Sequence, residues 1–360
     1  MTHDGSGDDS SRRDAATSEE HDGNATTRRD EGVTTSEDAT TALAPEEAFA
    51  ALGHEARTAT LETLADADEP LAFSEVYAGV PLDDSAQFNY HLDRLRGHFV
   101  DQTDAGYTLT AAGRRVVEAT LSGAITADPS FDRVEIDHDC PYCGATVTVA
   151  YRDEKLLSFC PDCGGTYDSI KGEREPPAPG YLGYQPLPPA GVDGRSPAEA
   201  RAAAHVWNVS DQVAVSRGVC PRCAADIDVW VRVCDAHESE SPASASDDGR
   251  PVCSACGNRH AAMHTAECPR CTYRQGGVLP VALLADDALL SFLLDHGLNP
   301  LSQTGGGHQF DTVLLGYEET VRSHEPVEVA LTFELDGETL TLVVDDTPTV
   351  TAATRSDTTE

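Results

Sequence analysis

Residues 220–237 read CPRCAADIDVWVRVCDAH, a stretch that begins with a CxxC pair and ends with Cys234 and His237 at the same spacing. The chain has 11 cysteines, and all except Cys234 fall into CxxC pairs: Cys140/Cys143, Cys160/Cys163, Cys220/Cys223, Cys253/Cys256 and Cys268/Cys271. Zinc in structural sites takes four tetrahedral ligands from Cys and His. We therefore interpret Cys234 and His237 as a sixth ligand pair.

With that pair, region 219–275 holds eight ligands, enough for two closed zinc sites. An in-order pairing gives one ion to Cys220, Cys223, Cys234 and His237, and the other to Cys253, Cys256, Cys268 and Cys271. An interleaved pairing uses the same residues, but similar spacing within each half favours the in-order version. In the alternative interpretation Cys234 is a buried apolar residue and His237 an exposed loop residue, which leaves six cysteines, an awkward number for one tetrahedral site.

Residues 140–165, CPYCGATVTVAYRDEKLLSFCPDCGG, predict a further zinc ribbon over 134–170. Two CxxC knuckles flank a β-rich segment. Four thiolates on two tight turns match the tetrahedral preference of zinc. Redox CxxC motifs are the alternative, but no thioredoxin-like βαβ pattern surrounds them. We expect three structural Zn²⁺ ions per chain, and His260 and His264 facing solvent rather than metal. Closed sites leave no position for a substrate, so we expect no enzyme.

Upstream of the cysteines, residues 43–125 carry the pattern of a helical domain with one hairpin. Apolar residues from Pro45 onward predict a first helix, 71–80 a second, and 84–100 a third with Asp84 and Gln87 as a capping box. A hairpin turning at 104–106 and a helix capped by Thr110 follow. Helix, helix, helix, hairpin, helix is the order of a winged helix-turn-helix.

The stretches ALGHEARTATLETLADA, QFNYHLDRL and GYTLTAAGRRVVEA resemble the ArsR-like winged-helix regulators, particularly haloarchaeal versions with added cysteine-rich segments. The resemblance implies a homodimer. Helix 84–100 would enter the major groove of double-stranded DNA, with arginines after the hairpin on the backbone. The candidate DNA contacts are Ser85, Gln87, Asn89, Tyr90, His91, Arg94, Arg114 and Arg115. No cysteine precedes Cys140, so arsenic-type sensing within this domain is not expected.

The charge balance indicates the solvent more than the partner. The net charge is -37, and only Lys155 and Lys171 are lysines. This composition resembles that of salt-loving archaea, whose carboxylate-rich proteins stay soluble in molar salt. Counterion release nearly vanishes there, so a DNA reader must depend on direct contacts. Without a signal segment or a run of 18 apolar residues, we expect a cytoplasmic protein with no membrane partner.

The remaining segments complete an α+β multi-module prediction: an N-terminal winged helix-turn-helix, small β zinc ribbons and a C-terminal α/β segment. We expect disordered tails at 1–42 and 351–360, a Pro/Gly-rich linker or packed strap at 171–195, and a helix at 196–218 opened by Ser196. Val206, Trp207 and Val209 should be buried in that helix. Region 278–350 should hold an amphipathic helix and a hairpin turning at Asp336 and Gly337.

The leading functional hypothesis is a sequence-specific transcriptional regulator. A winged helix followed by a zinc ribbon is also the order of archaeal TFIIE-type factors, so the alternative is a basal or RNA-polymerase-associated factor whose ribbons contact protein of the transcription machinery. Winged helices also serve as protein-binding modules. A zinc-dependent enzyme is the weakest hypothesis, because phosphate-loop, nucleophile-elbow and HExxH motifs are absent from the sequence.

Overall fold

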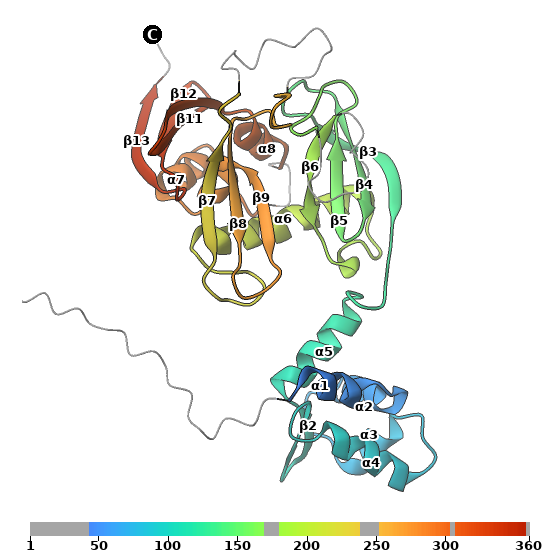
Figure 1. Ribbon diagram of the computed structural model, residues 1–360. Helices are drawn as coiled ribbons and strands as arrows, with labels where there is room; N and C mark the ends of the chain where they lie inside the picture. Colours follow the sequence, from blue (N-terminus) through green and yellow to red (C-terminus); the bar gives the residue numbers. More distant parts are fainter. Residues whose placement is uncertain (1–42, 169–179, 238–251, 303–306, 358–360) are drawn as a thin grey trace, which may run out of the picture. The chain divides into compact units, whose positions relative to one another are not determined.

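The computed structural model describes residues 43–168, 180–237, 252–302 and 307–357. The predicted tail at 1–42 lies outside these residues. Within them the chain is α+β, with four small antiparallel sheets whose strand orders are β1-β2, β3-β4-β5-β6, β7-β8-β9 and β10-β11-β12-β13 (Figure 1). Cysteines flank the second and third of these sheets, as expected for zinc ribbons.

The N-terminal elements follow the predicted order, with one more helix. They are α1 (Pro45–Leu52), α2 (Glu55–Ala65), α3 (Phe73–Ala78), α4 (Ser85–Leu95), β1 (Val100–Thr103), β2 (Gly106–Leu109) and α5 (Ala111–Leu121). The single helix predicted from Pro45 is wrong, because the chain breaks at Gly53, whose amide donates to the Phe49 carbonyl at 3.1 Å. Glycine disfavours continuing a helix, so α1 ends there. Phe49 on α1 is exposed.

Aromatic and leucine side chains form the core under α4. The Phe88 ring lies 5.0 Å from that of Phe73 and 5.3 Å from that of Tyr77. Leu92 and Leu95 are 0% exposed. The apolar stripe predicted on this helix is therefore confirmed as its buried side.

The predicted N-caps Asp84 and Thr110 are both confirmed, but the capping box predicted at Asp84 is not. The Asp84 carboxylate caps α4 by accepting from the Ala86 amide at 2.8 Å, without the predicted return contact from Gln87. The Thr110 hydroxyl accepts from the Gly113 amide at 3.0 Å and so caps α5. Gly113 is required there, because a Cβ would lie 2.1 Å from the Phe99 carbonyl oxygen.

The first ribbon sheet is larger than predicted. Its strands are β3 (Phe131–Asp139), β4 (Thr146–Arg152), β5 (Lys155–Phe159) and β6 (Tyr181–Pro186). Strand β6 lies within the segment 171–195 that we predicted as a linker, so that prediction is wrong for residues 181–186. Residues 171–179 of the same segment lie outside the described residues. The open edge of β5 explains the difference, since β6 pairs along it with Leu157 opposite Tyr184. The short helix η1 (Pro189–Gly191) follows.

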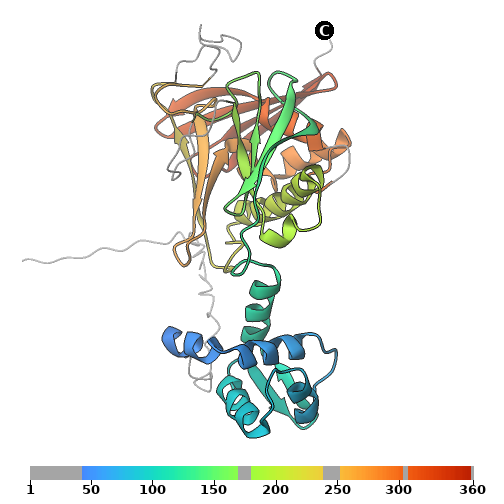
Figure 2. The ribbon, with the colours of Figure 1, turned by 90° about the vertical axis from the view of Figure 1, so that its right-hand side faces the viewer.

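Helix α6 (Pro197–Ser216) packs against this sheet (Figures 1 and 2). Its predicted opening is confirmed, because Ser196 and Glu199 form a reciprocal capping box. Val209 is buried as predicted. Trp207 is 43% exposed, which corrects the prediction that it is buried.

A second small sheet is formed by β7 (Asp228–Val233), β8 (Ala262–Glu267) and β9 (Arg274–Val278). Strands β7 and β8 pair antiparallel over their full length, with Asp228 opposite Glu267 at one end and Val233 opposite Ala262 at the other. Figure 1 shows the three strands side by side. The acidic segment 238–251 between β7 and β8 lies outside the described residues.

The C-terminal segment contains η2 (Leu279–Leu283), α7 (Asp287–Asp295), α8 (Gly307–Leu315), β10 (Glu318–His324), β11 (Val327–Leu335), β12 (Glu338–Val344) and β13 (Val350–Asp357). The predicted β11–β12 turn is confirmed, with φ of 51° at Asp336 and 82° at Gly337. The amphipathic helix is two elements, since Asp286 caps a new helix at α7. The tail predicted at 351–360 is wrong through residue 357, which ends β13.

One hydrophobic core joins segments that we predicted as separate modules. It contains Val209 of α6, Val231 of β7, Phe292 of α7 and Leu331 of β11. The ranges 196–218, 219–275 and 278–350 therefore pack as one body. None of the helices in the described ranges has the length and apolar character that crossing a bilayer requires.

The buried stripe of α4 generates a stability prediction. Leu92→Ala should destabilise the α2–α5 region by about 2 to 5 kcal/mol, because it removes buried methyl groups and leaves a cavity. Native-state hydrogen exchange of the α4 amides in molar KCl measures this. Leu121→Ala, at a side chain that is 68% exposed, is the control. Equal protection in both variants would contradict the assigned core.

Candidate metal centres and polar helix face

Three groups of metal-ligating side chains converge in the described residues. Centre 1 is Cys140, Cys143, Cys160 and Cys163; centre 2 is Cys220, Cys223, Cys268 and Cys271; centre 3 is Cys234, His237, Cys253 and Cys256. Within each centre the ligand atoms lie within 4.8 Å of one another. All 12 predicted metal ligands are therefore brought together, including the Cys234 and His237 pair.

The ligand spacing fits zinc. A tetrahedral ion with Zn–S bonds of about 2.3 Å places its sulfurs about 3.8 Å apart. The Sγ atoms of Cys140 and Cys163 are 3.7 Å apart, those of Cys220 and Cys271 3.6 Å. A disulfide would hold its sulfurs at about 2.05 Å. All 11 cysteines are free thiols, so the residues present suit a thiolate-bound ion.

The in-order pairing that we favoured is wrong, and so is the interleaved alternative, because the two centres are nested. Centre 2 takes its two pairs from the outer ends of region 220–271, and centre 3 takes the two inner pairs. The reason is the extended β7, whose six residues cover about 20 Å and cannot fold back to bring Cys234 to Cys223. Antiparallel pairing with β8 brings Cys268 beside Cys223 instead, with their sulfurs 3.6 Å apart.

Backbone amides at the knuckles point at the thiolates. Cys160 Sγ accepts from the amides of Asp162 and Cys163, each at 3.4 Å. In centre 2, Cys268 Sγ accepts from the Arg270 amide at 3.4 Å. Such hydrogen bonds stabilise the charged thiolate that a metal requires. The contact with the Cys140 thiol also lowers the pKa of Cys163 to about 5.

Centre 3 uses a defined face of its histidine. His237 Nε2 donates to the Arg259 carbonyl at 3.1 Å, which leaves Nδ1 unprotonated and 3.6 Å from Cys256 Sγ. Burial lowers the pKa of His237, which favours the neutral imidazole that binds metal. A second hydrogen bond of this kind is what orients a metal-ligating histidine. The sequence motif contains no sign of this acceptor, which lies 22 residues away.

Glu319 of β10 holds the strand that leaves centre 3. Its two carboxylate oxygens accept from the amides of Ala261 and Ala262, at 2.6 and 3.0 Å. Ala261 in turn accepts from the Cys234 amide at 3.0 Å. Burial raises the pKa of Glu319 to about 7, against the opposing effect of the two amide donors. Sequence analysis missed this residue, because its role depends on the pairing of distant strands.

His260 and His264 are buried, which corrects the prediction that they face solvent. His260 stacks on Tyr317 with ring centroids 4.2 Å apart. His264 Nδ1 donates to the Val278 carbonyl at 3.0 Å. Burial lowers the pKa of His260 to about 3 and that of His264 to about 4. Neither lies in one of the three metal groups found among the described residues. His260 lies in a bend before β8 and His264 lies within β8, so their interval of four does not mark a helix face.

The second candidate site is the polar face of α4, defined as Ser85, Gln87, Asn89, Tyr90 and Arg94. All five are exposed. Asn89 Nδ2 donates to Asp93 Oδ2 at 3.2 Å. The Arg94 guanidinium lies 5.4 Å from the centroid of the Tyr90 ring. The face therefore offers amide, aromatic and guanidinium groups to solvent, with one carboxylate beside them.

Of the other three predicted DNA contacts, one is buried and two are exposed. His91 is 5% exposed, so its placement on the polar face is wrong. It lies on the buried side of α4, together with Leu92 and Leu95. Arg114 and Arg115 are exposed in the first turn and a half of α5, after the β1–β2 hairpin.

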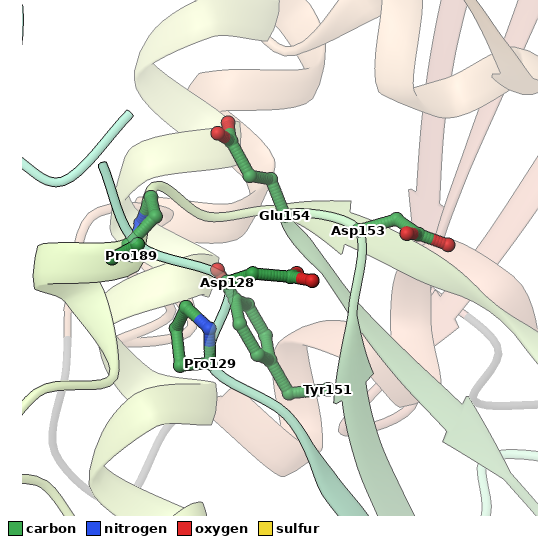
Figure 3. Close-up of a pocket in the computed structure, with 7 residues that line it drawn as sticks. Asp128, Pro129, Tyr151, Asp153, Glu154 and Pro189 are labelled. Atoms are coloured by element: carbon green, nitrogen blue, oxygen red, sulfur yellow. The ribbon is translucent and has the colours of Figure 1, made fainter. Parts of the chain in front are cut away.

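A pocket of about 380 Å³ is lined by Ala127, Asp128, Pro129, Tyr151, Asp153, Glu154 and Pro189 (Figure 3). Figure 3 shows Asp153 and Glu154 pointing in different directions from the β4–β5 turn. The Tyr151 hydroxyl donates to the Leu187 carbonyl at 2.8 Å. The acidic groups thus do not converge as the ligands of the three centres do, and we assign no site to the pocket.

Mutation of one ligand distinguishes the nested pairing from the in-order pairing. With three zinc ions per loaded chain, Cys271→Ser should lower the count by one, measured by native mass spectrometry. The other three thiols of centre 2 should then become alkylatable while the three thiols of centre 3 stay protected. Exposure of Cys253 and Cys256, with protection of Cys220 and Cys223, would instead support the in-order pairing.

Glu319 gives a pH prediction. Its pKa is raised above the unfolded value of 4.5 to about 7. The folded chain thus holds this proton more tightly, and the free energy of unfolding falls as pH rises between these values. Glu319→Gln should remove about 1 kcal/mol of that fall between pH 6 and 8. Zinc-loaded chains are compared by denaturant unfolding, with exposed Glu318→Gln as control. Identical pH profiles for Glu319→Gln and wild type would contradict the assignment.

Two family models match the chain. One, described as a domain of unknown function (DUF7351), covers residues 137–350, which include all three centres and most of the C-terminal sheet. The other, also a domain of unknown function (DUF7347), covers residues 45–120. No curated protein and no solved structure matches. Since the first family model matches more than half of the chain, the chain belongs to the DUF7351 family.

Proposed function

We propose that the chain is a sequence-specific, DNA-binding transcriptional regulator whose residues 43–125 act as a winged helix-turn-helix and whose three metal centres hold structural zinc. The observation that carries the proposal is the polar face of α4. Its residues Gln87 and Asn89 are exposed on a helix whose opposite side, at Phe88 and Leu92, is fully buried. A helix of this kind fits the major groove of B-DNA.

The chemistry of the polar face suits base recognition. Gln and Asn amides pair with adenine through its N6 and N7 groups, and Arg pairs with guanine through O6 and N7. Gln87, Asn89 and Arg94 supply these groups. The β1–β2 hairpin follows α4 and serves as the wing, and Arg114 and Arg115 behind it contact the phosphate backbone. Helix α3, which packs through Phe73 on Phe88, is the first helix of the motif.

Electrostatics favour base contacts over phosphate contacts in this protein. The Asp93 carboxylate lies on the same helix and pairs with Arg96 at 2.9 Å, so one of the few cations is already neutralised. The overall charge of -37 repels a polyanion at low salt. In the molar salt that the composition indicates, this repulsion and the counterion-release term are both weak. Affinity then depends on hydrogen bonds to bases.

The metal centres support a structural role for zinc and a non-enzymatic protein. Each centre offers four protein ligands, which saturates tetrahedral zinc and leaves no coordination position for water or substrate. When bound, zinc would supply the free energy that holds the small sheets together. The homodimer that we propose rests on the ArsR-like resemblance.

Genome-wide occupancy of the tagged protein, crosslinked in its host at native intracellular salt, tests the proposal. A specific dimeric regulator should occupy a few operators that share a palindromic sequence. Occupancy of most active promoters without a shared sequence would instead support the polymerase-associated alternative. Absence of enrichment would indicate that the N-terminal domain binds protein, and would overturn the proposal.

Substitution on the polar face tests the reading residues. Asn89→Ala should weaken binding to an operator by about 1 to 3 kcal/mol, roughly 5- to 150-fold, because a bidentate contact to a base is lost. Footprint titration in molar KCl measures this. Glu118→Ala, at an exposed position on α5, is the matched control. Equal affinities for wild type, Asn89→Ala and Gln87→Ala would show that another face reads the DNA.

A further inference from the structure

Centres 1 and 3 come from different parts of the chain, yet their knuckles are joined by a short strand pairing. Residues 257–259 lie along residues 165–168, with a bridge between Tyr167 and Asn258. The Asp168 amide donates to the Gly257 carbonyl at 2.9 Å, and the Arg259 amide donates to the Thr166 carbonyl at 2.9 Å. The segment that follows Cys256 is thereby fixed on the segment that follows Cys163.

Gly257 shows how closely the two segments approach. Its φ is +70°, and a Cβ at this position would lie 2.2 Å from an Asp168 carboxylate oxygen. The same residue closes the centre 3 knuckle, because its amide donates to the Cys253 carbonyl at 2.7 Å. One residue therefore belongs both to the turn that presents two ligands of centre 3 and to the contact with centre 1.

Arg259 contacts both centres, one through its backbone and the other through its side chain. Its carbonyl accepts from His237 Nε2, which orients a ligand of centre 3. Its side chain lies against centre 1: Nε donates to the Gly165 carbonyl at 3.1 Å, and the guanidinium lies 3.7 Å from the centroid of the Tyr142 ring. Tyr142 stands between Cys140 and Cys143, and Gly165 follows Cys163 closely in sequence.

The two knuckles of centre 1 are also linked to each other at this point. The Tyr142 hydroxyl and the Thr166 hydroxyl are 3.0 Å apart, and Thr166 is fully buried. Arg259 therefore contacts the Tyr142 ring of the first knuckle and the Gly165 carbonyl beside the second. Both contacts require that the two knuckles of centre 1 lie together. When centre 1 comes apart, the Arg259 side chain loses both contacts.

We infer that centres 1 and 3 bind zinc cooperatively and that Arg259 is the positioning residue that couples them. Metal in centre 1 holds Tyr142 and Gly165 in place, which fixes Arg259 and with it the acceptor for His237. Coupling between two sites is reciprocal, so metal in centre 3 also stabilises centre 1. Centre 2 lies at the far end of β7, away from the pairing of residues 257–259 with residues 165–168, and serves as an internal reference. The inference rests on the proposed zinc occupancy of the centres and not on the proposed DNA binding.

The test is a double-mutant cycle on the full-length, zinc-loaded chain. Zinc is withdrawn by a chelator at native salt, and alkylation followed by peptide mass spectrometry gives the rate of opening for each centre. Cys143→Ser removes one ligand of centre 1. It should raise the rate of zinc loss from centre 3 about 10-fold or more, as loss of an outer-shell partner does. Centre 2 should keep its wild-type rate.

The second arm of the cycle replaces the coupling residue. Arg259→Ala should open centre 3 faster even with centre 1 intact, and adding Cys143→Ser should then have little further effect. Exposed Arg270→Ala, in the centre 2 knuckle, is the matched control and should leave the coupling unchanged. An unchanged centre 3 rate in Cys143→Ser, or the same effect of Cys143→Ser with and without Arg259, would overturn the inference.

A folding failure is recognised from centre 2. Should Arg259→Ala also open that centre, the cycle is repeated with Arg259→Lys, which keeps the charge but loses the Nε hydrogen bond and the planar guanidinium. Reduced coupling in Arg259→Lys supports the inference. Full wild-type coupling in that variant would show that the Arg259 side chain does not carry it.

Discussion

The antiparallel pairing of β7 with β8 is the constraint on which the arrangement of the metal centres depends. Each strand has six residues, and a ribbon of that size buries too little apolar surface to be stable alone. Centre 2 lies at one end of the pair and centre 3 at the other. Zinc binding contributes about 10 to 16 kcal/mol in small zinc-finger peptides. Ligands outside the strands therefore stabilise the strands between them.

The same ribbon is anchored along its length to the C-terminal sheet. The Val231 amide donates to the Asp346 carbonyl at 2.8 Å, and Val231 shares a core with Leu331 and Leu342. Glu319 adds a bidentate clamp to the start of β8. The C-terminal sheet thus holds backbone groups of β7 and β8, and the metal-ligating residues lie at both ends of this strand pair. The β7–β8 pair therefore has little freedom to shift its register. The metal centres are thus part of the body and not appendages to it.

The sequence predicted what local chemistry specifies and missed what strand pairing decides. All 12 ligands were found because CxxC and CxxH spacings reflect single tight turns. The pairing was missed because it depends on whether 224–233 forms a hairpin or a strand, and the alternation in DVWVRV, without a turn residue, was the available signal. His91 was misplaced for a related reason. It lies beside Leu92, at the border of the apolar stripe, where sequence periodicity does not resolve which way a side chain turns.

Salt affects the two candidate sites differently. In molar salt the Debye length is about 3 Å, so exposed ion pairs such as Asp93 with Arg96 contribute little. Buried groups are less screened. Although burial opposes its ionisation, Asp311 keeps a pKa of about 2 beside Arg201 and His138, and so joins α8, α6 and β3. Thiolate–metal bonds are likewise insensitive to screening. Buried ion pairs and, when metal is bound, thiolate–metal bonds therefore hold distant segments together with little sensitivity to salt. The face of α4 that we propose for DNA recognition would likewise depend on the hydrogen bonds of its amides rather than on charge.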